Sequence, residues 1–134
     1  MTRQFSTAVR NALAGAFEGV VGAGPTLEIR TGAPPASCAA ADSGTLLASI
    51  ALPSDWLGAA SAGAVASTAT WSTSSAAATG TAGHYRLKDG ASSVHEQGTV
   101  TATGAGGDMQ LASTSIDAGQ AVAITAYSFG VGGA

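Results

Sequence analysis

The sequence has few residues of the kinds that carry charge. Only 10% of its 134 residues are charged, whereas about a quarter are charged in an average soluble domain. Five basic and eight acidic residues give a net charge of −3. The basic residues are scattered along the chain, so no basic stripe is present to bind phosphates. We therefore expect neither a nucleic-acid partner nor a lipid-surface partner.

Cysteine is nearly absent, because Cys38 is the only one. A disulfide within the chain is therefore excluded, although a small secreted domain would normally contain one. The N-terminal residues lack the apolar core of a signal peptide, and no apolar run approaches the length of a membrane span. We expect a protein made and folded in a reducing cytoplasm and not inserted in a membrane. Cys38 lies in a loop of small residues, where it either fills space or crosslinks two copies.

The sequence also lacks the motifs that are typical of catalytic, metal and phosphate sites. The two histidines, His84 and His95, have no spacing to acidic residues such as Glu96 and Asp108 that is typical of a metal site, which needs three or four converging ligands. No G-x-S-x-G nucleophile elbow is present. The glycine-rich segment before Asp108 lacks the G-K-[ST] end of a phosphate loop. We expect no catalytic residues, no metal and no cofactor, and hence not an enzyme.

The second half of the chain, from residue 80 to 129, contains short alternating segments separated by glycine-rich turns. This pattern predicts a mainly β fold, a single antiparallel β-sandwich with one short N-terminal α-helix. Leu, Ile, Val and Phe together number 23 of 134 residues, so we expect a thin core that is completed by packing against other chains. The predicted strands span residues 26–31, 45–52, 64–71, 83–88, 94–101, 108–113 and 121–129.

The fourth and fifth predicted strands form a hairpin around the turn at Asp89 and Gly90. In the strand over residues 83–88, Tyr85 and Leu87 are expected to face the core. The intervening residues are expected to face solvent: His84, Arg86 and Lys88. If Lys88 pairs with Val94, then Arg86 lies opposite Glu96. In this register the two histidines face opposite sides of the sheet.

An amphipathic helix is predicted over residues 6–18, with Ser6 as its N-cap. Phe5, Val9, Leu13 and Phe17 recur at four-residue spacing and form one apolar stripe. The stripe either packs on the chain's own sandwich or docks into a neighbouring protein. We divide the chain into a helical arm, residues 1–25, and a β-sandwich domain, residues 26–134.

A partner interface is predicted from the helix stripe, from the loop that begins at the two prolines, and from the two tryptophans. Tryptophan is frequent among residues that dominate binding energy. Trp56 could instead cover the core, because Leu52 and Leu57 lie beside it. The predicted interface residues are Phe5, Val9, Leu13, Phe17, Pro34, Pro35, Trp56 and Trp71.

The chain resembles a family of small virion structural proteins of tailed phages. The segments that carry the resemblance are LEIRTGAPPAS, GTLLASIALP, ATGTAGHYRLKDG, VHEQGTVT and GGDMQLASTSIDAGQAVAITAYSF, after a short N-terminal helix. The resemblance implies a jelly-roll-like sandwich that binds the outside of a capsid, or the head–tail neck, as a homo-oligomer. It implies a location in the virion and the major capsid protein, or neck proteins, as partners. It supplies no catalytic residues.

Three functions follow as hypotheses. The first is a capsid decoration, or cement, protein that stabilises the head shell by binding capsid subunits without a covalent bond. The second is a neck, collar or tail structural protein of the same virion. The third is a carbohydrate-binding or receptor-binding module, which would need exposed tryptophans.

Overall fold

The computed structural model describes residues 3–124 and 127–133 and is mainly β, as predicted, with one helix. The helix begins one residue after its cap, since the Ser6 Oγ accepts a hydrogen bond from the Val9 amide at 3.2 Å. It extends three residues beyond the predicted end. The elements are α1 (Thr7–Val21), β1 (Thr26–Thr31), β2 (Leu46–Ala51), β3 (Ala64–Ala66), β4 (Trp71–Thr73), β5 (Gly80–Lys88), β6 (Val94–Ala102), β7 (Met109–Leu111), β8 (Ser115–Ile116), β9 (Val122–Ile124) and β10 (Ser128–Gly130).

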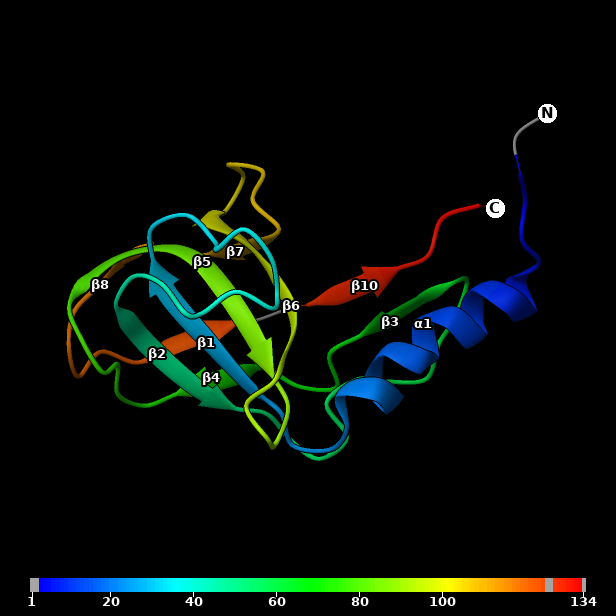
Figure 1. Ribbon diagram of the computed structural model, residues 1–134, viewed down its shortest axis with the longest axis horizontal. Coiled ribbons are helices and arrows are strands. Elements are labelled where there is room, and N and C mark those ends of the chain that lie inside the picture. The colour runs from blue at the N-terminus through cyan, green and yellow to red at the C-terminus, as the bar shows by residue number, and fades with distance from the viewer. Residues whose placement is uncertain (1–2, 125–126, 134) are drawn as a thin grey trace.

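The body of the molecule is a curled six-stranded sheet (Figure 1). The strands follow the order β2-β1-β5-β6-β7, and β8 pairs with the start of β5. The β6–β7 pair is parallel, so the prediction of antiparallel pairing throughout is wrong at this position. The backbone doubles back between these strands because Gly104 and Gly106 adopt positive φ angles of 88° and 87°, which glycine tolerates.

Two small sheets complete the β structure, β4 with β9 and β3 with β10. The single strand predicted over residues 64–71 is therefore wrong: it is two strands that belong to different sheets. Residues 67–70 separate them. The Ser67 amide still donates to the Tyr127 carbonyl beside β10, whereas the Thr68 amide donates to the Trp56 carbonyl outside that pairing. The strand predicted over 121–129 contains β9 and β10, and residues 125–126 between them lie outside the described ranges.

The β5–β6 hairpin has an irregular register. Lys88 pairs with Val94, as predicted, but the register shifts between Leu87 and Lys88. Arg86 therefore lies opposite Gln97, and the prediction that it faces Glu96 is wrong. A bulge adds one residue to one strand and reverses the face of every residue beyond it. The shift brings Glu96 onto the core side of the sheet, opposite Leu87.

The helix, β3 and β10 form an arm that extends from the body (Figure 1). The helix packs along the β3–β10 pair, and Phe17 meets Phe129 with ring centroids 5.0 Å apart. The described ends of the chain lie together at the tip of the arm, where the Phe5 amide donates to the Gly133 carbonyl at 2.7 Å. One continuous apolar core connects the arm with the body and contains Ala14 and Val21 of α1. Over the described residues, no helix has the length and apolar character that crossing a membrane requires.

Candidate functional site

The large hydrophobic side chains that are exposed within the described ranges all lie on α1 or immediately before its cap. Phe5 is 38% exposed, Val9 44%, Leu13 49% and Val20 70%. We call the surface made by these four residues the α1 face. Single exposed apolar residues are ordinary on soluble proteins, whereas a group of them on one element marks an interaction surface.

Helix geometry explains why these residues share a face. Val9, Leu13 and Val20 are spaced by four and seven residues, and successive helical residues rotate by about 100°. Their side chains therefore line one side of α1. A second apolar row contains Ala14, Phe17 and Val21, and it turns toward the body. The helix is apolar on two adjacent sides, of which only one is covered.

The α1 face is also uncharged, because both charged residues of α1 are turned against the rest of the protein. The Arg10 Nη2 donates to the Ala62 carbonyl at 2.6 Å. The Glu18 Oε2 accepts a hydrogen bond from the Leu57 amide at 2.7 Å. A partner that covers the α1 face would therefore desolvate no charged side chain of α1, which lowers the free-energy cost of binding.

Phe17 is separated from the other three residues of the predicted stripe. Residues four apart on a helix are separated by one full turn plus about 40°, so a row with this spacing drifts around the helix axis. By Phe17 the stripe has moved around the helix, and this ring packs edge to face against Trp56, with centroids 5.5 Å apart. Val20 takes its place on the exposed side. The sequence interpretation missed Val20 because it ended the helix at residue 18, although its seven-residue spacing from Leu13 was visible.

Both tryptophans belong to the core, so their prediction as exposed interface residues is wrong. Trp56 is 0% exposed and Trp71 is 2% exposed, and their ring centroids are 5.9 Å apart. The Trp56 indole N–H donates to the Gly22 carbonyl at 3.0 Å, which fixes the end of α1 to the body. The alternative prediction, in which Trp56 covers the core, is confirmed by this burial.

The two prolines of the predicted interface begin a loop, residues 32–44, that is held against the outer side of the main sheet. Pro34 and Pro35 are half-buried. The Gln97 Nε2 donates to the Pro35 carbonyl at 2.7 Å, and the Arg86 Nη2 donates to carbonyls of the loop. Three loop carbonyls accept from that nitrogen: Ser37, Cys38 and Ala40. These bonds hold the loop in place, so it is a fixed layer that covers the outer side of the sheet while much of its own surface stays exposed.

The loop buries side chains that were predicted to face solvent. That prediction is wrong for His84, Arg86 and Lys88, which are 0%, 1% and 9% exposed. Asp42 of the loop compensates their charge: its Oδ1 lies 2.6 Å from Arg86 Nη1, and its Oδ2 lies 2.6 Å from Lys88 Nζ. The hydrogen bond from Lys88, with smaller effects of the Arg86 hydrogen bond and the Arg30 charge, holds the pKa of Asp42 below its ordinary value, although partial burial opposes this.

A second polar group lies on the core side of the sheet. The Glu96 Oε1 accepts hydrogen bonds from the Tyr85 hydroxyl at 2.9 Å and from the Tyr127 hydroxyl at 3.0 Å. Burial raises the pKa of Glu96, and the negative charge of the nearby Asp108 raises it further. The hydrogen bonds from the two tyrosine hydroxyls lower it, but by less. Burial, together with the charge of Glu96, also raises the pKa of both tyrosines. Glu96 thus connects the main sheet to the segment that leads into the arm.

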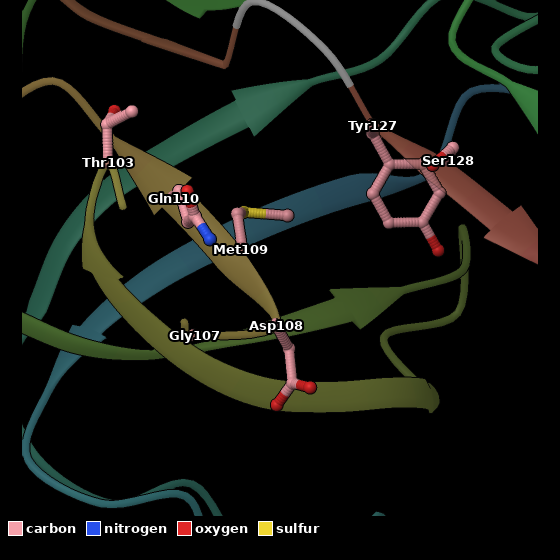
Figure 2. A pocket seen from close by; sticks show the side chains of 7 residues that line it. All are labelled: Thr103, Gly107, Asp108, Met109, Gln110, Tyr127 and Ser128. Carbon is pink, nitrogen blue, oxygen red and sulfur yellow. The ribbon is translucent and has the colours of Figure 1, made fainter. Parts of the chain in front are cut away.

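A pocket of about 310 Å³ lies beside this group, between β7 and the start of β10 (Figure 2). The Met109 side chain points toward the Tyr127 ring across the pocket. The Asp108 carboxylate points toward β6, where its Oδ2 accepts from the Thr99 amide at 3.0 Å. This carboxylate therefore holds the β6–β7 connection.

The histidines do not converge on a common site. The His84 Nδ1 lies 2.9 Å from the Gly32 carbonyl oxygen, and the His95 Nε2 lies 2.8 Å from the Asp89 Oδ2. His95 falls at the register shift of the hairpin, so the alternation used to place it on the opposite face does not apply there. Within residues 3–124 and 127–133, no group of three or more His, Cys, Asp or Glu residues is arranged to hold a metal ion. Cys38 is a half-buried free thiol.

No known protein family, curated protein or solved structure matches this chain.

Proposed function

We propose that the chain is a structural protein of a tailed-phage virion, a decoration protein that binds the outside of the capsid shell through its α1 face. One observation carries the proposal: the exposed large hydrophobic residues are gathered on one uncharged side of an arm that projects from the body (Figure 1). A surface of this kind suits burial against another protein. The partner in this proposal is the major capsid protein.

The energy available from the α1 face is moderate for each copy. Fully burying one Val, Leu or Phe side chain contributes about 1.5–3 kcal/mol. Phe5, Val9, Leu13 and Val20 are partly exposed, so each contributes only part of this, and association costs several kcal/mol. Many copies bind one shell, so their modest individual binding free energies add up to a large stabilisation of the shell. Because ligands stabilise the state that they bind, a protein that binds assembled shells and not free subunits would stabilise the shell.

The proposal includes two features of fold and assembly. The first is that the curled sheet and the β4–β9 pair form a jelly-roll-like sandwich, supported by the core that lies between β2 and β4 around Trp71. The second is a homo-oligomer on the shell, supported by the thin core and by the small number of charges on the chain. The carbohydrate-binding alternative loses its main support, because both tryptophans are buried.

Co-sedimentation of the purified protein with undecorated, tail-free shells tests the proposal. We expect saturable binding at many copies per shell and a higher melting temperature of the shells. Binding of only a few copies, and only to heads that carry the portal, would indicate a neck or collar protein instead of a decoration protein. Absence of binding to both kinds of head would refute both roles in the virion head.

A further inference from the structure

A cavity of about 540 Å³ lies on the opposite side of the sheet from the core, between the loop and the β5–β6 turn. Residues 38–42 line one side, and Ser92, Ser93 and Val94 line the other. Arg86 and Lys88 of β5 also line it. The side chains of Arg86 and Lys88 are 1% and 11% exposed, so the sheet and the loop fix their positions. The cavity belongs neither to the α1 face nor to the pocket of Figure 2.

The cluster beside the cavity carries more positive than negative charge. Its cations are Arg30, Arg86 and Lys88, and its carboxylates are Glu28 and Asp42. Three positive and two negative charges leave an excess of one positive charge. The next carboxylate along the chain, that of Asp89, is directed into its own turn, where it accepts from the Ser93 amide at 3.0 Å and lies 2.8 Å from the His95 Nε2.

Hydrogen-bond donors are also in excess. The Asp42 carboxylate is occupied, since one oxygen contacts Arg86 and the other contacts both Lys88 and Arg30. A lysine ammonium has three N–H donors, and Lys88 contacts two carboxylates. Lys88 therefore keeps one N–H donor beyond its two carboxylate contacts. The Arg86 Nε is buried and has no acceptor within the described part of the chain.

We propose that this cavity binds an oxyanion, a phosphate or a carboxylate, with Lys88 and Arg86 supplying the charge and the hydroxyls of Ser92 and Ser93 supplying neutral donors. Charge-assisted bonds to oxyanions are about twice as strong as neutral ones. This inference does not depend on the proposed function, because no residue of the α1 face takes part.

Amide chemical shifts measured by NMR on the full chain at pH 7 test the proposal. Sodium phosphate and sodium acetate serve as separate probes, each against sodium chloride of equal ionic strength. We expect saturable shifts confined to the residues that line the cavity, 38–42, 86, 88 and 92–94. The probe that saturates at the lower concentration identifies phosphate or carboxylate as the preferred ligand.

Two variants and one control decide the outcome. Lys88→Gln should weaken binding about tenfold or more, the effect of losing one charge-assisted bond. Arg3→Gln removes the same charge from an exposed residue and should leave binding unchanged. If Lys88→Gln fails to fold, Ser93→Ala keeps the ion pairs and should weaken binding several-fold. Shifts that never saturate, or an equal loss in the Arg3 variant, would overturn the proposal.

Discussion

Phe17 of α1 meets Trp56 of the body edge to face, with ring planes inclined by 76°. This contact fixes the helix in place, since the same indole also donates to the Gly22 carbonyl just beyond the helix. With the inward side of α1 occupied, the adjacent side, which contains Leu13, is left uncovered. The two sides of the helix therefore have different functions, and substitutions on them should have different effects.

Phe17→Ala should reduce the free energy of unfolding by about 2–4 kcal/mol, because it removes a ring that packs in the core. Leu13→Ala should change it by no more than about 0.5 kcal/mol, because that side chain is half exposed. Urea unfolding monitored by tryptophan fluorescence measures both values. Equal losses in the two variants would mean that Leu13 is also packed in the folded chain.

Asp42→Asn should reduce the free energy of unfolding by about 1–3 kcal/mol, because it leaves Arg86 and Lys88 with a neutral partner. Asp42 has a lowered pKa in the folded state. Its stabilising effect is therefore present above the ordinary value of 3.8 and is lost as the pH falls through the folded pKa. Asp55→Asn, at an exposed site, is the matched control. A similar loss in both variants would contradict the role of the ion pairs.

Glu96 should give the opposite pH dependence. Its pKa is raised in the folded state, so its contribution to stability is greatest below the ordinary value of 4.5 and is lost as the pH rises through the folded pKa. We expect the free energy of unfolding of the native chain to fall above pH 4.5 relative to that of Glu96→Gln. Urea unfolding at a series of pH values compares the two chains, and parallel profiles would refute the assignment.

Gly83→Ala should destabilise the protein by about 1–3 kcal/mol, because a Cβ at this position would overlap the backbone of Gly32. That contact lies where the loop leaves the sheet. Gly90→Ala is the control, since no atom lies within 4 Å of a Cβ built there. Thermal unfolding of both variants measures the difference. A Gly83 variant as stable as the Gly90 variant would show that the loop can move away at little cost.

The parts of the fold that depend on local pattern were predicted from the sequence. The alternation of Leu27 and Ile29 predicted β1 with correct ends, and Ser6 predicted the helix cap. The burial of Arg86 was not predictable, because a basic residue in an alternating strand is normally exposed. Its partner Asp42 lies 44 residues away in a loop without regular structure, and no local pattern connects them.

The candidate site was predicted only in part for the same reason. The spacing of Val9 and Leu13 predicted an apolar stripe, but the sequence does not specify which side of a helix with two apolar sides the body will cover. The tertiary contact of Phe17 with Trp56 decides this. The bulge at His95 likewise reversed the faces of one strand end, and it has no signal in the composition of the hairpin.

The proposed contact between the α1 face and the capsid shell can be tested with one pair of charge variants. The double variant Leu13→Glu/Val20→Glu places two charges on the exposed side of α1 without altering the buried side. Its control, Ala102→Glu/Ala121→Glu, adds the same charge at exposed positions of the body. In co-sedimentation with undecorated shells, we expect the control to saturate the shells as the native chain does, while the α1 variant stays in solution. Equal binding of both variants, with the α1 variant shown to be folded, would contradict it.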